Sequence, residues 1–262
     1  MIESLTNNKI KQVTGLQTKS KERRKSGLFV AEGIKMFMEA PIELIEAVYV
    51  SNSYATDLSK QTEPERKKLE ETGYEEVSEA CFLKMSDTQT PQGILTVLRM
   101  PSFSYEEVIK KEKGMYVILE GLQDPGNLGT IMRTAEGAGV TAIIANKDTV
   151  DLYNPKTIRS TMGSIYRVPF FSVDNLEEAI KTLQEEGAVI YAAHLKGEKF
   201  YHEFDYTKKT GFLIGNEGNG LSDEISSLAD EYLKIPMEGK LESLNAAVAT
   251  AILVYEGHRQ RA

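Results

Sequence analysis

The stretch FLIGNEGNGL, residues 212–221, is an apolar run that leads directly into a loop with three glycines. A short apolar run of this kind is typical of a buried strand in an α/β sheet. The glycines allow the loop backbone to approach a ligand or another loop closely. The stretch lacks the GxGxxG spacing of dinucleotide-binding loops, and Glu217 would repel a pyrophosphate. Two interpretations remain, a plain strand–turn–helix connection or a binding loop, and the carboxylate inside the loop favours the second.

Strand-like and helix-like segments alternate on both sides of this stretch. Apolar runs predict strands at residues 115–119, 142–145, 168–171, 188–193, 211–214 and 232–235. Helical patterns cover residues 127–138, 175–186 and 244–256. Short strands that alternate with helices imply an α/β domain with a mainly parallel sheet.

The N-terminal part shows a less regular alternation. Strands are predicted at residues 28–30, 42–50, 74–77 and 93–98, and helices at residues 64–72 and 79–84. The sequence MPSFS, residues 100–104, then interrupts the pattern before a helix rich in Lys and Glu. Because Pro and Ser are typical of linkers, we expect a domain at residues 1–99, a linker at 100–112 and a second domain at 113–262.

The composition, 41% hydrophobic and 27% charged, is typical of a soluble globular protein. No apolar run approaches the ~20 residues of a membrane span, and the N-terminus lacks the pattern of a signal peptide. The one cysteine, Cys81, excludes an internal disulfide and a CxxC metal site. His194, His202 and His258 have no ligand spacing, so no metal is expected. We therefore expect a reduced, cytoplasmic protein with no membrane contact.

Charge is unevenly distributed along the chain. The net charge of -8 argues mildly against a nucleic-acid partner, because phosphate contacts need Lys and Arg. The first 35 residues nevertheless carry eight Lys and Arg against three Glu, and KSKERRK, residues 19–25, is the densest run. This segment is either a solvated terminus or a contact to a nucleic-acid backbone.

A second polar corner is EGLQDPGN, residues 120–127, which follows the predicted strand at 115–119. Gly, Pro and Asp predict a turn, and Asn127 is predicted to cap the helix behind it. Arg133 lies six residues further along that helix. Taken alone, the corner is equally well read as a capped helix whose arginine pairs with a surface carboxylate.

A third corner begins with IPM, residues 235–237, at the end of a predicted strand. Pro236 has no backbone N–H to donate, so the chain must turn there. After a short loop, Ser243 or Asn245 can cap a helix that is expected to begin at Leu244. Small polar side chains at a helix N-terminus suit a phosphate, a ribose or a carboxylate. The alternative for Ser243 is a simple helix cap.

In this order and spacing, the three corners resemble the motifs of the SpoU–TrmH family of S-adenosylmethionine-dependent RNA 2'-O-ribose methyltransferases, in the SPOUT superfamily. The Asn…Arg, Gly-x-Glu-x-x-Gly and Ile-Pro-Met…Ser-Leu-Asn motifs are all present, and the resemblance covers residues 115–261. Residues 21–33 and 90–94 resemble the small N-terminal RNA-binding domain of the family, an α/β domain with a ribosomal-protein fold.

The resemblance implies a fold that gathers the three corners. The C-terminal sheet would carry a deep trefoil knot, an exception to the rule against knotted chains. The second and third loops would wrap S-adenosylmethionine, with four cofactor-lining positions at Leu195, Gly215, Ile235 and Leu244. The resemblance also implies a homodimer through the knot domain, with an RNA partner and no metal.

The chemistry requires an oriented ribose hydroxyl and removal of its proton, because a hydroxyl is a poor nucleophile. By resemblance, the catalytic positions are Asn127, Arg133, Glu217, Ser243 and Asn245. A guanidinium stays protonated in proteins and is a poor base. We therefore favour Arg133 as an anchor for the RNA phosphate next to the target ribose. Asn127 and Glu217 are expected to orient it.

The function expected from this resemblance is 2'-O-ribose methylation of RNA, and the N-terminal domain favours 23S-type ribosomal RNA over transfer RNA. The basic segment then becomes an expected contact to the RNA backbone, through Lys21, Arg23, Arg24 and Lys25. The alternatives are a catalytically silent RNA-binding or ribosome-assembly factor and, disfavoured by the missing GxGxxG, an NAD-type enzyme.

Overall fold

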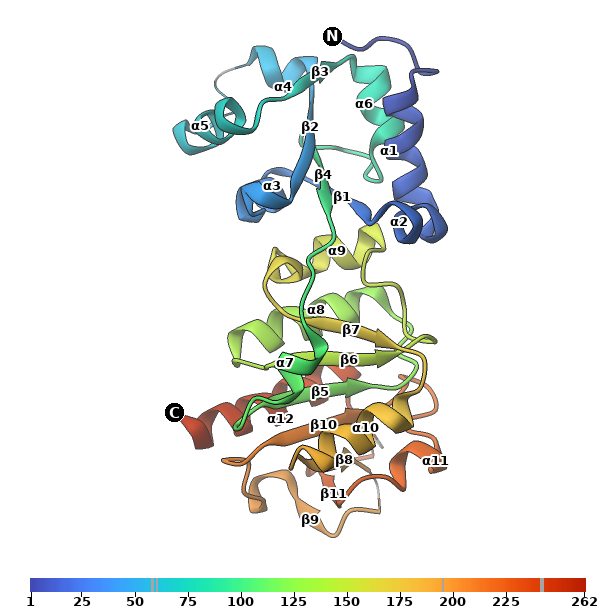
Figure 1. Cartoon of the computed structure of the whole chain (residues 1–262), viewed down its shortest axis with the longest axis vertical. Coiled ribbons are helices and arrows are strands. Elements are labelled where there is room, and N and C mark those ends of the chain that lie inside the picture. Colours follow the sequence, from blue (N-terminus) through green and yellow to red (C-terminus); the bar gives the residue numbers. More distant parts are fainter. Residues whose placement is uncertain (58, 60, 195, 241–242) are drawn as a thin grey trace. The chain divides into compact units, whose positions relative to one another are not determined.

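A computed structural model describes residues 1–57, 59, 61–194, 196–240 and 243–262. The chain divides into two compact units (Figure 1). The first unit contains Met1–Pro101 and Asp151–Tyr166, and the second contains Ser102–Val150 and Arg167–Ala262. The chain thus leaves the second unit once, contributes a short segment to the first unit, and returns.

The first unit is built on a mixed four-stranded sheet in the order β1-β4-β2-β3. Its strands are β1 (Leu28–Glu32), β2 (Ile45–Ser51), β3 (Glu75–Val77) and β4 (Ile94–Arg99). Strand β4 is antiparallel to both β1 and β2, whereas β2 and β3 are parallel. The strand predicted at 42–50 begins late, because Ile42–Leu44 forms a 3-10 turn, η1, directly after Pro41.

Helices cover both faces of this sheet, as Figure 1 shows. They are α1 (Asn8–Thr18), α2 (Ser20–Ser26), α3 (Ile34–Glu39), α4 (Asn52–Thr56), α5 (Glu63–Thr72) and α6 (Glu79–Met85). One core joins α1 and α6 to the sheet through buried side chains such as Val13 and Phe82. The second core lies under α3, α4 and α5 and includes Phe37 and Tyr54.

The segment Asp151–Tyr166 belongs to the packing of the first unit. It holds α9 (Pro155–Thr161) and the 3-10 turn η3 (Ser164–Tyr166). The Tyr166 hydroxyl donates to the Met36 carbonyl at 3.1 Å, and the rings of Tyr153 and Phe29 lie 4.9 Å apart between centroids. Residues far apart in the sequence therefore build one core here.

The second unit contains a seven-stranded sheet in the order β7-β6-β5-β10-β8-β11-β9. Its strands are β5 (Met115–Leu119), β6 (Ala142–Asn146), β7 (Phe170–Val173), β8 (Val189–Ala193), β9 (Lys199–Phe200), β10 (Thr210–Ile214) and β11 (Glu231–Lys234). All six strand pairings are parallel, so the predicted parallel sheet is confirmed. The two-residue edge strand β9 was not predicted.

Helices also flank this sheet on both faces. They are α7 (Tyr105–Ile109), α8 (Pro125–Gly137), α10 (Leu176–Glu185), α11 (Asp223–Ser226) and α12 (Ala246–Arg261), and η4 (Tyr201–Glu203) is a 3-10 turn. Helices α7, α10 and α11 share one core with the sheet, while α8 and α12 pack on each other. Among the described residues, no helix is long and apolar enough to cross a membrane.

The parallel arrangement determines where the polar corners lie. Leu119 at the end of β5 is in register with Ile214 at the end of β10. Strand β8 lies between β10 and β11 in the sheet. Since the carboxyl ends of parallel strands meet at one edge, the loops that follow these strands lie together, which is where α/β sheets usually bind ligands.

Candidate active site

The three polar corners meet in a chain of side-chain hydrogen bonds. The Asn127 amide nitrogen donates to Glu217 Oε1 at 2.9 Å, and the Asn127 carbonyl oxygen accepts a 2.9 Å bond from Asn245 Nδ2. Glu217, Asn127 and Asn245 come from the three separate motifs. The fold thus brings the three segments into direct contact, with Asn127 between the other two.

The prediction that Asn127 caps α8 is wrong. Asp124 is the N-cap, and its Oδ1 accepts the Asn127 backbone N–H at 2.8 Å. Pro125 occupies the first helical position, where its fixed φ and missing N–H are tolerated, and this moves the helix start two residues earlier. The Asn127 side chain is therefore free to link Glu217 to Asn245.

Glu217 attaches the glycine-rich loop to the loop after β5. Besides the bond from Asn127, its carboxylate accepts the backbone N–H of Gln123 at 3.0 Å and that of Asp124 at 2.9 Å. Partial burial raises the pKa of Glu217, but the bonds from Gln123, Asn127 and Asp124 together lower it below the ordinary glutamate value. The carboxylate is thus ionised, and its oxygens already accept hydrogen bonds from within the protein.

Asn216 shapes the glycine-rich loop, and the sequence interpretation missed it. Its backbone N–H and C=O both pair with Gly220, and its Oδ1 accepts the N–H of Gly218 at 2.8 Å. Its Nδ2 donates to the Gly121 carbonyl at 2.7 Å. A Cβ on Gly215 would lie 2.2 Å from the Gly220 carbonyl carbon, so only glycine fits there. The sequence signal was Asn-x-Gly, a common turn pattern.

Asn245 is the N-cap of α12, one of the two predicted candidates. Its Oδ1 accepts the N–H groups of Ala247 at 2.9 Å and Val248 at 3.3 Å. Helix α12 begins at Ala246, two residues after the predicted start. Ser243 is exposed and precedes the cap. The same Asn245 side chain therefore caps the N-terminus of α12 and bonds to Asn127 of the first motif.

Arg133 lies exposed on α8. Among the described residues its guanidinium makes no hydrogen bond or ion pair, in contrast to the expectation that Asn127 and Glu217 orient it. The polar atoms of Asn127 and Glu217 bond to each other instead. Asn127 also accepts a bond from Asn245, and Glu217 also accepts bonds from two backbone N–H groups. The guanidinium is therefore available to an anion from solution.

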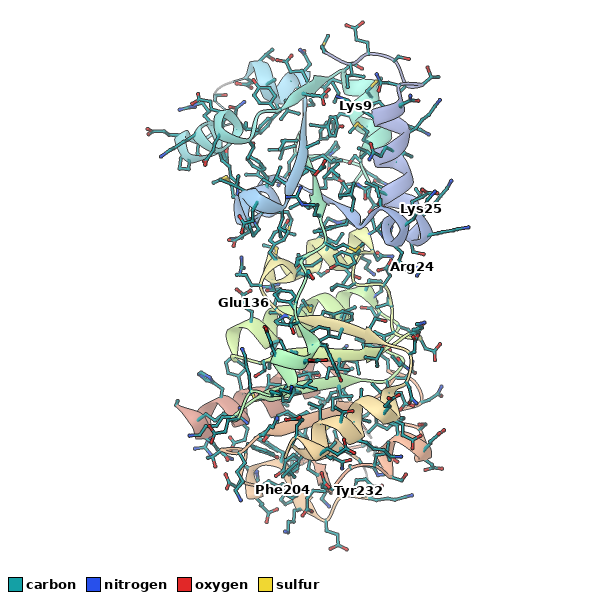
Figure 2. All side chains as sticks on the ribbon, in the orientation of Figure 1. Lys9, Arg24, Lys25, Glu136, Phe204 and Tyr232 are labelled. Carbon is teal, nitrogen blue, oxygen red and sulfur yellow. The ribbon has the colours of Figure 1, made fainter. Side chains whose placement is uncertain are left out.

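The basic segment contains residues of two kinds. Lys21, Arg24 and Lys25 on α2 are exposed (Figure 2 labels Arg24 and Lys25), whereas Arg23 is only 5% exposed. The Arg23 guanidinium bonds to Asp151 Oδ2 at 2.6 Å and to the Leu16 carbonyl at 2.7 Å. The expectation of an RNA contact is therefore corrected for Arg23, because its charge is buried and paired within the first unit.

Three expected cofactor positions lie at the loop edge of the second sheet. Gly215 directly follows β10, and Ile235 directly follows β11, on either side of β8. Leu244 precedes Asn245 and is half-buried, as are Gly215 and Ile235. Backbone groups beside apolar side chains at such an edge suit a nucleoside cofactor. Leu195, the fourth expected position, is outside the described residues. No group of three His, Cys, Asp or Glu within the described part of the chain could hold a metal.

Two family models match the chain. The model of the SpoU rRNA Methylase family matches residues 114–255. The chain belongs to the SpoU rRNA methylase family. A model of the MRM3-like substrate binding domain matches residues 7–96 of this SpoU methylase.

Known relatives cover nearly the whole length of the SpoU methylase. It is 35% identical to 23S rRNA (guanosine(2553)-2'-O)-methyltransferase RlmP of Bacillus subtilis, over 97% of both chains. The AdoMet-bound rRNA methyltransferase of Sinorhizobium meliloti is 31% identical, with a TM-score of 0.84 over 98% of this chain and 97% of the other. AviRb of Streptomyces viridochromogenes in complex with AdoMet is 26% identical, with a TM-score of 0.82 over 97% and 99%. The protein is an RNA 2'-O-ribose methyltransferase, and its cofactor is S-adenosylmethionine.

Proposed function

We propose that this SpoU methylase modifies a ribose of 23S-type ribosomal RNA. The observation that carries the proposal is its full-length similarity to the 23S rRNA methyltransferase of Bacillus subtilis. The match of residues 7–96 to a substrate binding domain supports a role of the first unit in RNA recognition. Three of the predicted basic residues, Lys21, Arg24 and Lys25, remain exposed for that role.

The cofactor is held by the loop edge of the second unit in this proposal. When bound, S-adenosylmethionine supplies an electrophilic methyl group. The backbone of Gly215, Ile235 and Leu244, with Leu195 as a predicted fourth position, binds its nucleoside. Gly215 suits this position because its loop closes so tightly on Gly220 that no side chain could be accommodated.

We assign different tasks to the five predicted catalytic residues. Arg133 anchors the RNA phosphate next to the target ribose, because its guanidinium is exposed and uncommitted among the described residues. Glu217, Asn127 and Asn245 act as positioning residues, since their polar atoms hold the three loops together. Ser243 is exposed directly before the N-terminus of α12, where it can contact the ribose.

We further propose that the second unit is knotted and that two copies of the chain associate through it. The hydrogen bonds that join Asn127 to Glu217 and to Asn245 support the knot, because they bring the second and third loops against the first at one sheet edge. Support for the dimer comes from α12, where Val248 and Tyr255 are 48% and 49% exposed. They are seven residues apart and therefore share one helix face.

Methylation mapping tests the proposed substrate. Ribose 2'-O-methylation is mapped across 23S, 16S and transfer RNA from a deletion strain and its parent. Loss at one 23S site, restored by the wild-type gene and not by a gene encoding Arg133→Ala, supports the proposal. Loss in transfer RNA alone would overturn the ribosomal assignment. Purified protein that moves no labelled methyl group to any of these RNAs would favour a silent assembly factor.

A further inference from the structure

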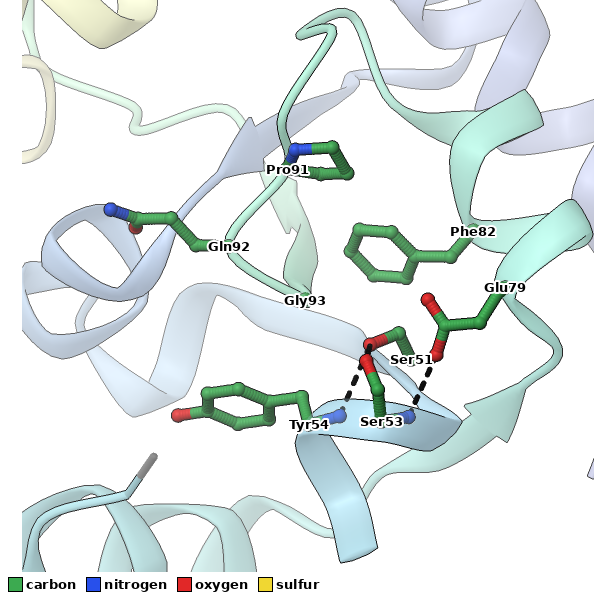
Figure 3. A pocket seen from close by; sticks show the side chains of 8 residues that line it. All are labelled: Ser51, Ser53, Tyr54, Glu79, Phe82, Pro91, Gln92 and Gly93. Carbon is green, nitrogen blue, oxygen red and sulfur yellow. Dashed lines mark hydrogen bonds between the residues drawn. The ribbon is translucent and has the colours of Figure 1, made fainter. Parts of the chain in front are cut away.

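Two hollows adjoin each other in the first unit, where β1 and β2 end and β4 begins. The smaller, about 130 Å³, includes Ser51, Ser53, Glu79 and Phe82 in its lining (Figure 3). The larger, about 340 Å³, includes Lys35, Arg159 and Met162. Gln92 lines both hollows, so a ligand strand that passes Gln92 can occupy the two together.

The smaller hollow has an apolar wall and a floor without a side chain. Phe82, 1% exposed, forms the wall. Gly93 lies at the floor, where a Cβ would come within 2.7 Å of Tyr54 Cβ and 2.9 Å of Ser51 Oγ. Its φ of +88° is in the region that glycine adopts readily. The fold thus keeps this space open beside an aromatic ring.

The polar groups of the smaller hollow are fixed and only partly used. Glu79 Oε1 accepts the Ser53 backbone N–H at 2.7 Å. Among the described residues Oε2 has no hydrogen bond, and Figure 3 shows it turned toward the Phe82 ring. The Ser51 and Ser53 hydroxyls lie 3.2 Å apart. Since Ser51 is fully buried and Ser53 is exposed, the Ser53 hydroxyl is the group that can donate to a ligand. The hollow therefore offers a charged acceptor beside a donor.

This combination selects one kind of ligand. The exposed Glu79 carboxylate repels a phosphate and favours N–H donors. Phe82 is almost fully buried, so it bounds the hollow and does not itself select the ligand. Guanine carries two adjacent N–H donors, N1–H and N2–H₂, beside its O6 acceptor. Unpaired RNA bases are commonly bound through the Watson–Crick edge.

The larger hollow presents cationic side chains. It contains two cationic side chains, Lys35 and Arg159, and one carboxylate, Glu32. The Glu32 carboxylate is buried and accepts bonds from the Ser86 hydroxyl at 2.6 Å and the Asp87 N–H at 2.9 Å. Arg159 is held by Asp87 at 2.7 Å and remains partly exposed. Lys35 Nζ pairs with Glu39 Oε1 at 2.5 Å and also remains exposed. Because both cations are paired at the surface, where ion pairs are weak, they can still contact the phosphates of a nucleic-acid strand.

We propose that the first unit binds an unpaired guanosine of the RNA substrate, with the base in the smaller hollow and the strand phosphates at Lys35 and Arg159. The inference rests on the proposed function, because it takes ribosomal RNA as the substrate. Arg159 reaches this site from the segment Asp151–Tyr166, so the second half of the sequence contributes to it. Glu79 is the specificity-determining residue.

Binding of short labelled RNAs to the full-length protein, followed by fluorescence anisotropy, tests the site. The wild type is expected to bind UUGUU about tenfold more tightly than UUAUU. Glu79→Gln keeps an acceptor for the Ser53 N–H but can turn an amide donor toward the base, so the preference for guanine is expected to disappear. Lys35→Ala is expected to weaken the binding of both RNAs equally and to reduce the salt dependence of binding. Glu70→Ala, which removes an exposed acid from α5, is the matched control. It is expected to change neither the preference for guanine nor the salt dependence of binding.

Four results would overturn the inference: no measurable RNA binding, no preference for UUGUU in the wild type, an unchanged preference in Glu79→Gln, or free guanosine monophosphate binding as tightly as UUGUU. Circular dichroism and thermal melting of each variant exclude misfolding as the cause of a loss. Labelled methyl transfer to 23S RNA is measured with the same preparations. Methyl transfer without a guanine preference would refute this site alone, whereas absent transfer would refute the proposed function.

Discussion

Asn127 and Asn245, 118 positions apart in the sequence, are joined by a 2.9 Å hydrogen bond between their side-chain amides. Asn245 also caps α12, and Asn127 also donates to Glu217. A single amide thus holds the first turn of α8 to the start of α12 and to the glycine-rich loop. The loops that we propose to hold the cofactor are fixed before any ligand arrives, which favours binding because less ordering is needed.

Asn127→Ala removes both side-chain bonds and leaves Glu217 and Asn245 each without one partner. With a net value of about 1 kcal/mol for each exposed bond, the free energy of unfolding is expected to fall by roughly 1–2 kcal/mol. S-adenosylmethionine affinity, measured by calorimetry, is expected to fall about tenfold or more. Thr130→Ala, which removes an exposed hydroxyl from the same helix, is the control. Unchanged cofactor affinity in Asn127→Ala would show that the network does not support the pocket.

Glu217 is expected to make stability depend on pH. Its pKa is lowered in the folded state, so the ionised carboxylate contributes stability above the ordinary glutamate pKa. That contribution is lost as the pH falls through the lowered value. Urea unfolding of the wild type and Glu217→Gln, measured from neutral to acidic pH, is expected to show a difference that shrinks on acidification. A difference that grows toward acidic pH would contradict the assigned direction of the shift.

Arg133→Ala is expected to abolish methyl transfer while S-adenosylmethionine affinity stays within about twofold. The reason is that the guanidinium forms no hydrogen bond or ion pair with any described residue and is proposed to bind the RNA phosphate. Lys181→Ala, an exposed cation on α10, controls for the loss of positive charge. Methyl transfer at the wild-type rate in Arg133→Ala would remove Arg133 from the site.

Two neighbouring arginines on α2, Arg23 and Arg24, are expected to have different roles, the first in stability and the second in RNA binding. Arg23→Ala leaves Asp151 without its buried partner and is expected to lower the free energy of unfolding by about 2–3 kcal/mol, somewhat less than for a fully buried pair because Asp151 is partly exposed. Arg24→Ala is expected to leave stability unchanged and to weaken RNA binding with a smaller salt slope. Thermal melting and salt-dependent RNA binding of the two variants separate the roles. Equal melting temperatures would refute the structural role of Arg23.

Local sequence patterns predicted most of the second sheet. Strand β5 has its predicted bounds because its five residues form one buried apolar run between Gly114 and Glu120. The start of α8 was misplaced because Asp124 and Asn127 are both good N-cap residues. Only Pro125, which favours the first helical position, indicates that Asp124 is the cap. The two-residue strand β9 depends on pairing with β11, which leaves no local signal.

The site was predictable in its residues but not in its connections. Motif spacing identified Asn127, Glu217 and Asn245, whereas the bonds between them span 90 and 118 positions. Hydrophobic periodicity and secondary-structure propensity are local properties of the sequence and do not predict such a long-range contact. The burial of Arg23 has the same origin, because its partner Asp151 lies 128 positions away. The sequence therefore indicated which side chains carry chemistry, and the tertiary contacts decided which of them face solvent.

The exposed face of α12 is expected to control association. Val248→Asp places a charge on the proposed apolar interface, while an acidic residue in the first turn of a helix is favourable for that helix. The variant is therefore expected to stay folded and to raise the dimer dissociation constant at least tenfold, as measured by light scattering over a concentration series. Arg259→Ala, at the other end of α12, is the control and is expected to associate as the wild type does. A wild type that stays monomeric at all concentrations, or a fully dimeric Val248→Asp, would place the interface elsewhere or remove it.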